Sequence, residues 1–165
     1  MKIIDNYFID SDFKKITNMF ESSICPWYYA KGVIDWNNRD NNNKLDDYFF
    51  CHMVYEKLTP QSNYFYDLIK IIEPKSLGII TRIKCNMYPR TAKVNVHPWH
   101  TDSPTHKLRG ALLMLNTCDG FTEFKDGTKV NSVANRMVLF DSSKEHRSTS
   151  TSNVSVRMTL NINYV

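Results

Sequence analysis

The second half of the chain alternates apolar and polar residues, which is the pattern of β-strands with two chemically different faces. In "IITRIKCNMYP" (79–89) one face carries Ile79, Ile83, Cys85 and Met87, and the other carries Arg82, Lys84, Asn86 and Tyr88. In "VSVRMTLNINYV" (154–165) the apolar Val154, Val156, Met158, Leu160 and Ile162 alternate with the polar Ser155, Arg157, Thr159, Asn161 and Asn163. The pattern predicts two long strands, each with one largely polar face.

Further elements follow from shorter patterns. Strands are predicted in "LRGALLMLN" (108–116) and "NRMVLFD" (135–141), with turns at "CDG" and "KDG". The aromatic run 48–55 predicts another strand. It follows "DWNNRDNNNKLDD" (35–47), which is too polar to be buried and is interpreted as a loop.

Two helices are predicted before these strands. The first begins in "IDSDFKKITNMFES" with Ser11 as N-cap, and its apolar face is formed by Phe13, Ile16 and Phe20. The second lies in "TPQSNYFYDLIKIIEP" with Pro60 in its first turn, and its apolar face is formed by Phe65, Leu68, Ile69 and Ile72.

Periodicity leaves two arrangements of the strands open. In the commoner one the apolar faces point inward and the polar faces meet water. In the other the apolar faces pack against the two helices and the polar faces line a cavity, as in a double-sheet jelly roll. Two helices followed by a run of short strands favour the second arrangement.

Length and composition change this picture little. The 165 residues, 42% hydrophobic and 23% charged, indicate one globular domain spanning 1–165. Four widely spaced cysteines without a CxxC pair indicate reduced thiols. No apolar run is long enough to span a membrane and no signal peptide begins the chain, so a cytoplasmic protein without a membrane partner is expected. The net charge of +4 permits anionic substrates and does not favour nucleic acid.

Candidate metal ligands gather in "VNVHPWHTDSPTH" (94–106). His100 and Asp102 are two residues apart, so on an extended strand both side chains project from the same face. A third ligand must come from His97, His106 or His146. His97 is an odd number of residues from His100 and points the other way, whereas a turn at "SPT" could bring His106 back. His146 follows a predicted strand through a short polar loop, which would deliver it to a cavity mouth.

The ligand types indicate a particular chemistry. Two histidines and one carboxylate on one face of an octahedron leave three positions open, as in non-haem Fe(II) oxygenases. A closed zinc site would instead need a fourth ligand and usually thiolates.

A second cluster points to a bound acid. Arg157 and Thr159 share the polar face of the last predicted strand, and an arginine fork with a neighbouring hydroxyl grips a carboxylate. Asn86 and Tyr88, on the polar face of an earlier strand, would supply further donors. Together these residues predict an anchor for a small dicarboxylic acid beside an open iron site.

These motifs, in this order and spacing, resemble the 2-oxoglutarate- and Fe(II)-dependent dioxygenases, in particular the prolyl 4-hydroxylase-like branch. The resemblance covers roughly residues 79 to 165 and rests on "CNMYP", "WHTD", "LRGALLMLN", "GFTEF", "NRMVLFDSSKEH" and "VRMTLN". The segment "CPWYYAKGV" also looks like small oxygenases encoded by marine bacteriophages.

The resemblance implies a fold and a set of roles. The fold is mainly β with packing helices (α+β): a double-stranded β-helix, which is a distorted, cupin-like jelly roll, with its core at about 79–165 and N-terminal helices supporting the sheet. His100, Asp102 and His146 would bind Fe(II), and Arg157, helped by Thr159 and Tyr88, would bind the distal carboxylate of 2-oxoglutarate. Dioxygen would be the oxidant and ascorbate a candidate reductant.

Two details of the family pattern bear on this chain. The family often has glycine where this chain has Asn135, and asparagine also tolerates a positive φ. Related halogenases replace the carboxylate ligand with a small residue, so Asp102 predicts hydroxylation.

The substrate is less determined by sequence. A peptidyl proline in a protein or peptide is the first expectation, and Arg109 and Trp99 are candidate contacts. One alternative is oxidation of a nucleobase or a free amino acid, for which Trp99 with Arg90 and Lys93 could form a stacking and basic surface. Another is a non-enzymatic cupin-like module that binds metal. His97 and His106 are assigned to the rim of the site, and the oligomeric state is left open.

Overall fold

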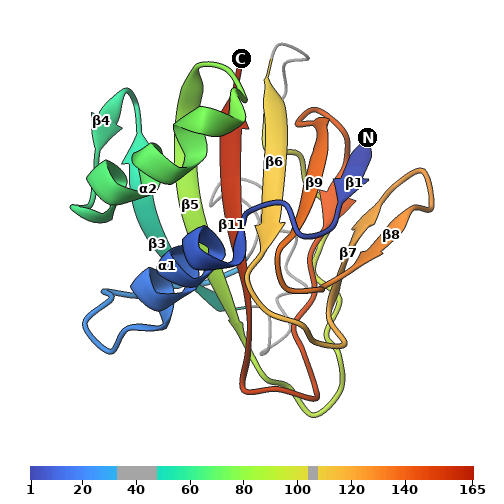
Figure 1. The fold of residues 1–165 in the computed structure, drawn as a ribbon. Helices are drawn as coiled ribbons and strands as arrows, with labels where there is room; N and C mark the ends of the chain where they lie inside the picture. Colours follow the sequence, from blue (N-terminus) through green and yellow to red (C-terminus); the bar gives the residue numbers. More distant parts are fainter. Residues whose placement is uncertain (33–47, 104–107) are drawn as a thin grey trace.

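The computed structural model describes residues 1–32, 48–103 and 108–165. Two α-helices and a short 3₁₀ helix accompany the strands in this part of the chain (Figure 1). In chain order the elements are β1 (Lys2–Ile4), α1 (Asp10–Glu21), β2 (Tyr28–Ala30), β3 (Phe49–Glu56), β4 (Thr59–Pro60), α2 (Tyr64–Ile72), η1 (Glu73–Lys75), β5 (Ile80–Pro89), β6 (Arg109–Met114), β7 (Phe121–Phe124), β8 (Lys129–Asn131), β9 (Arg136–Asp141), β10 (His146–Arg147) and β11 (Val156–Tyr164).

The strands form two antiparallel sheets. The main sheet has the order β1-β9-β6-β11-β5-β3-β2, with β4 paired to β3, and the smaller sheet has the order β10-β7-β8. β11 and β5, the two strands with polar faces, are neighbours, and Arg157 pairs with Tyr88 while Asn161 pairs with Lys84. The two polar faces therefore form one continuous surface.

Both helices cover one face of the main sheet (Figure 1). Ile16 and Phe20 of α1 and Leu68 of α2 are buried there, in one cluster with apolar residues of β5, β6, β9 and β11. Burying a side chain of this size contributes about 1.5–3 kcal/mol, so this layer is the main source of stability. The apolar faces of β5 and β11 thus point to the helices, as the second arrangement predicts.

The opposite face of the main sheet is apolar on some strands and polar on others. Leu112 and Met114 of β6 and Val138 of β9 pack against Phe124 and Val130 of the smaller sheet. On β11 the same face is polar and still buried, with Arg157, Thr159 and Asn161 at most 6% exposed. On β5, Asn86 and Tyr88 are buried, whereas Arg82 and Lys84 are half-buried. The predicted mainly β fold with supporting helices is confirmed, and the polar strand faces line the interior between the sheets.

Asn135 fixes the turn before β9. Its φ is 62°, so the expectation that asparagine replaces glycine in a positive-φ turn is confirmed. The side chain also accepts a hydrogen bond from the Phe8 N–H at 3.0 Å and donates one to the Phe8 carbonyl at 2.8 Å. Glycine would make neither bond, so Asn135 additionally holds the N-terminal segment that carries β1.

Two local predictions are wrong. α1 begins at Asp10 after Ile9, so Ser11 lies within the first turn and is not the N-cap. Pro60 pairs with Tyr55 in β4, and α2 begins only at Tyr64, because "TP" continues a tight hairpin from β3. The strand expected at 48–55 is β3, whereas the asparagine-rich segment 35–47 lies outside the described residues.

The cysteines and the helix lengths can be compared with the expectations from composition. Cys25, Cys51, Cys85 and Cys118 are all free thiols, and all but Cys51 are buried. Within residues 1–32, 48–103 and 108–165, no helix has the length and apolar character needed to cross a membrane.

Candidate metal centre

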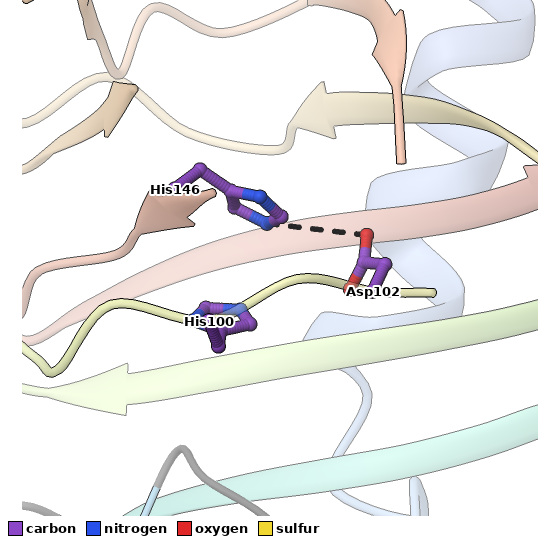
Figure 2. A group of neighbouring side chains, drawn as sticks. All are labelled: His100, Asp102 and His146. Carbon is purple, nitrogen blue, oxygen red and sulfur yellow. Dashed lines mark ion pairs between the residues drawn. The ribbon is translucent and has the colours of Figure 1, made fainter. Parts of the chain in front are cut away.

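His100, Asp102 and His146 lie together on the polar side of the main sheet (Figure 2). Each offers one ligand atom, and these atoms all lie within 4.8 Å of one another. His146 Nε2 is 3.9 Å from Asp102 Oδ2. Two backbone hydrogen bonds of 2.9 and 2.8 Å join His100 to His146, so the first residue of β10 is held beside the His-x-Asp segment. The three groups that the sequence separates by 46 residues thus converge on one point.

The two histidines are oriented and tuned by their surroundings. His146 Nδ1 lies 2.9 Å from the Lys144 carbonyl, which can only accept, so Nδ1 carries a proton and Nε2 is the ring nitrogen that faces Asp102. Burial and the neighbouring His146 lower the pKa of His100 to about 4, so its imidazole is neutral at physiological pH. A neutral imidazole is the form that ligates metals.

Asp102 is held as a carboxylate. Burial alone would raise its pKa, but His146, Arg82 and a hydrogen bond from Asn161 outweigh that effect and the pKa is lowered. Asn161 Nδ2 donates to Asp102 Oδ2 at 2.9 Å, and Arg82 Nη2 is 3.9 Å from Oδ1. The backbone N–H of Asp102 donates to the Ser142 carbonyl at 3.1 Å. The charge and orientation of this carboxylate are therefore fixed by its surroundings.

The three candidate ligands open onto a cavity of about 890 Å³. Its walls include the polar face shared by β5 and β11, which contributes Arg82, Lys84, Asn86, Tyr88, Arg157, Thr159 and Asn161. All four residues predicted to bind the dicarboxylic acid are in this list. The structure therefore places them in the same cavity as the candidate metal ligands.

Arg157 is a buried cation without a counter-charge in the described part of the chain. Its exposed fraction is 0%, and burial lowers the pKa of its guanidinium. Its Nη groups donate to the Thr149 carbonyl at 3.1 Å and to Thr122 Oγ1 at 2.9 Å, while its Nε has no hydrogen-bond partner among the described residues. Burying an unpaired charge is costly, so this position favours an anionic ligand.

Gly120 makes room for the Arg157 side chain. A Cβ at Gly120 would lie 2.5 Å from Arg157 Cδ and 2.5 Å from the Ser150 carbonyl oxygen. These contacts are far inside van der Waals distance, and the second atom belongs to the backbone. Any side chain at position 120 must therefore displace Arg157.

We expect Gly120→Ala to weaken 2-oxoglutarate binding by about tenfold or more, because a displaced guanidinium loses charge-assisted hydrogen bonds. Calorimetric titration of the metal-loaded protein with 2-oxoglutarate measures this.

Gly127→Ala is the matched control. Gly127 has a φ of 90°, and a Cβ there would meet no described atom within 4 Å, so alanine is strained by about 1–2 kcal/mol without touching the site. Equal loss of 2-oxoglutarate affinity in both variants would show that the effect of Gly120→Ala is general destabilisation.

Asn161 gives a second prediction. Asn161→Ala removes the hydrogen bond to Asp102, and we expect affinity for a divalent metal to fall about 10- to 100-fold. Asn163→Ala is the control on the same strand face, since both polar side-chain atoms of Asn163 are without hydrogen-bond partners among the described residues. Metal titration that gives the same affinity for both variants would contradict a positioning role for Asn161.

The other histidines of the segment 94–106 are separated from this group. His97 is only 2% exposed and its Nδ1 lies 2.8 Å from Ser148 Oγ, so its assignment to the rim is wrong. It packs against the ring of Tyr88, and burial lowers its pKa to about 3. His106 lies outside the described residues.

The two candidate substrate contacts are not in the cavity wall given by the described residues. Arg109 is exposed at the start of β6. Trp99 is half-buried, and the Arg147 guanidinium carbon lies 4.2 Å from its ring centroid. Their roles stay predictions.

Sequence reasoning gave no role to three residues that support the site: Gly120, Thr122 and Asn161. Asn161 shares the face of Arg157 and Thr159 at two-residue spacing, so its position in the site follows from the alternation already noted. Gly120 and Thr122 lie in the predicted turn and the strand after it. Their contacts with Arg157 depend on how the small sheet packs, which no local pattern encodes.

The donor set fits Fe(II) and 2-oxoglutarate. Two imidazoles and a carboxylate at a cavity wall would hold such a metal and leave it open to further ligands. In the same cavity Arg157 is a buried cation with no ion-pair partner among the described residues.

Comparison with known proteins gives a consistent result at the level of the fold. No protein-family model and no curated protein matches the sequence. Among solved structures, a prolyl hydroxylase from Trichoplax adhaerens, solved with a peptide fragment of the hypoxia inducible factor oxygen degradation domain, matches with a TM-score of 0.63 and 16% identity over 99% of this chain and 82% of that one.

Two bacterial structures are similarly close. A 2OG-Fe(II) oxygenase family oxidoreductase from Burkholderia pseudomallei has a TM-score of 0.64 and 10% identity over 98% of this chain and 84% of that one. HygX from Streptomyces hygroscopicus, solved with nickel and 2-oxoglutarate, has a TM-score of 0.61 and 11% identity over 98% of this chain and 80% of that one. The chain therefore has the double-stranded β-helix fold found in the 2OG-Fe(II) oxygenases.

Proposed function

We propose that the chain is an Fe(II)- and 2-oxoglutarate-dependent dioxygenase, with His100, Asp102 and His146 as metal ligands and Arg157 as the anchor of 2-oxoglutarate. The observation that carries this proposal is the buried guanidinium of Arg157, which has no ion-pair partner in the described chain and lies in the same cavity as the His-Asp-His group. The similarity of fold to 2OG-Fe(II) oxygenases supports it.

When bound, Fe(II) and 2-oxoglutarate supply the oxidation: dioxygen converts 2-oxoglutarate to succinate and carbon dioxide, and the substrate gains a hydroxyl group. The chain's own residues bind and orient. Asn161 holds Asp102, Lys144 fixes the ring of His146, and Thr122 holds the Arg157 fork. Thr159, Tyr88 and Asn86 line the same cavity as candidate partners of the acid.

We further propose a peptidyl proline as the substrate. The Trichoplax adhaerens prolyl hydroxylase, solved with a peptide, covers almost the whole chain in the structural comparison and supports this choice. A panel of proline peptides, each assayed for succinate formation above the turnover seen without peptide, tests it. Stimulation by at least one peptide, with a mass gain of one oxygen on proline, is expected.

If no proline peptide raises succinate formation while 2-oxoglutarate is still consumed, the substrate class is wrong and the oxygenase assignment stands. A fully inert protein that binds metal would instead favour the cupin-like binding module. For a nucleobase substrate, Trp99 is the candidate stacking surface, and the Arg147 guanidinium carbon already lies 4.2 Å from the centroid of that ring.

A further inference from the structure

One end of the cavity carries two cations, Arg82 and Lys84, of which only Arg82 contacts an acid of the proposed metal site, Asp102. β5 runs from Arg82 and Lys84 at this end to Tyr88, which pairs with Arg157. Tyr88 lies four residues beyond Lys84, which is about 13 Å along an extended strand. The basic end is thus separated from the Arg157 anchor. The candidate metal ligand Asp102 lies nearer to the basic end, because it contacts Arg82 and also Asn161, the residue of β11 that pairs with Lys84.

The charges lining the described cavity are unbalanced. The cations are Lys57, Arg82, Lys84 and Arg157, and the acids are Glu56 and Asp102. A metal would neutralise Asp102 and 2-oxoglutarate would neutralise Arg157. Three cations then face one carboxylate, so the remaining space favours an anion.

Of the two cations at the basic end, Lys84 is the one whose charge is less compensated by the described acids. It is half-buried, and its Nζ lies 5.5 Å from the ring centroid of Phe49, another cavity residue. Burial and the neighbouring Arg82 lower its pKa, although Asp102 and Glu56 act in the opposite direction. Among the described residues, Lys84 forms no ion pair with a carboxylate. Arg82 has a buried Nε that is also without a hydrogen-bond partner among the described residues.

We propose that Lys84 and Arg82 form a second anion-binding subsite, which holds a carboxylate or phosphate group of the molecule to be hydroxylated. For a peptide substrate, this means an acidic or phosphorylated side chain near the target residue. The inference rests on the proposed function, since the first anion is taken to be 2-oxoglutarate at Arg157.

The test uses the whole protein loaded with Zn(II), which does not turn over, and saturated with 2-oxoglutarate. Acetate and inorganic phosphate are titrated separately and followed by calorimetry. Lys84→Met keeps the unbranched stem and removes the charge, and Lys70→Met makes the same change at an exposed site on α2. We expect at least one of the two anions to bind saturably, and Lys84→Met to weaken it about tenfold or more.

The two anions distinguish a carboxylate from a phosphate subsite. The inference is overturned if neither anion saturates below about 100 mM, or if Lys84→Met and Lys70→Met bind both anions as the unchanged protein does. It is also overturned if Lys84→Met loses 2-oxoglutarate affinity, because Lys84 would then belong to the co-substrate anchor. Separately, turnover of 2-oxoglutarate by the Fe(II)-loaded protein without other substrate reports on the proposed function, so the two can fail independently.

Discussion

Arg157→Ala is expected to lower the affinity for 2-oxoglutarate by about a hundredfold or more and to abolish succinate formation at ordinary co-substrate concentrations. The guanidinium can offer two charge-assisted hydrogen bonds to a carboxylate, and each contributes about 1.5–3 kcal/mol. Calorimetry on metal-loaded protein and a succinate assay measure the two effects.

The same variant should cost little stability. It removes a fully buried charge that has no carboxylate partner in the described chain, which offsets part of the lost packing. A thermal unfolding midpoint close to that of the unchanged protein is therefore expected. Arg157→Lys, which keeps the charge and loses the fork, should retain intermediate affinity. Unchanged 2-oxoglutarate affinity in a folded Arg157→Ala protein would show that this residue is not the anchor.

His146→Ala is expected to lower affinity for a divalent metal by about a hundredfold or more, since even loss of an outer hydrogen bond to a ligand costs 10- to 100-fold. Oxygenase turnover should disappear with it. Titration with Fe(II) under anaerobic conditions, or with Mn(II) in air, measures the affinity.

His97→Asn is the control for this prediction. His97 is also buried and lies three residues from His100, but its Nδ1 contacts Ser148 Oγ, and it is not among the described residues that gather as candidate ligands. Asparagine can keep that hydrogen bond. Metal affinity should be unchanged, and a loss equal to that of His146→Ala would mean that the ligand set has been misassigned.

The elements that the sequence predicted well are those whose pattern is local and long. β11 shows an unbroken alternation over nine residues, and its two faces are placed as the cavity arrangement required. α1 and α2 bury the helical positions expected, including Ile16, Phe20 and Leu68. The candidate ligands depend less on local pattern than the strand prediction implied, because His100 forms only an isolated bridge with His146 and Asp102 lies in a bend outside the named strands.

Other features depend on packing between distant segments. Proline is acceptable both in the first turn of a helix and in a short edge strand. For Pro60 the pairing with Tyr55 decides for the strand, and the local sequence does not contain that information. His97 differs from a surface histidine only through Ser148 and Tyr88, about fifty and nine residues away in sequence. The closeness of Gly120 to Arg157 likewise follows from how the small sheet meets the main one.

The most direct test of the central claim, that one cavity holds both the metal and 2-oxoglutarate, is a crystal structure of the protein with both bound. The account predicts a metal ligated by His100, Asp102 and His146, with the distal carboxylate of 2-oxoglutarate on the Arg157 guanidinium. A metal held by other residues, or a 2-oxoglutarate whose distal carboxylate lies on Lys84 with Arg157 unoccupied, would contradict it.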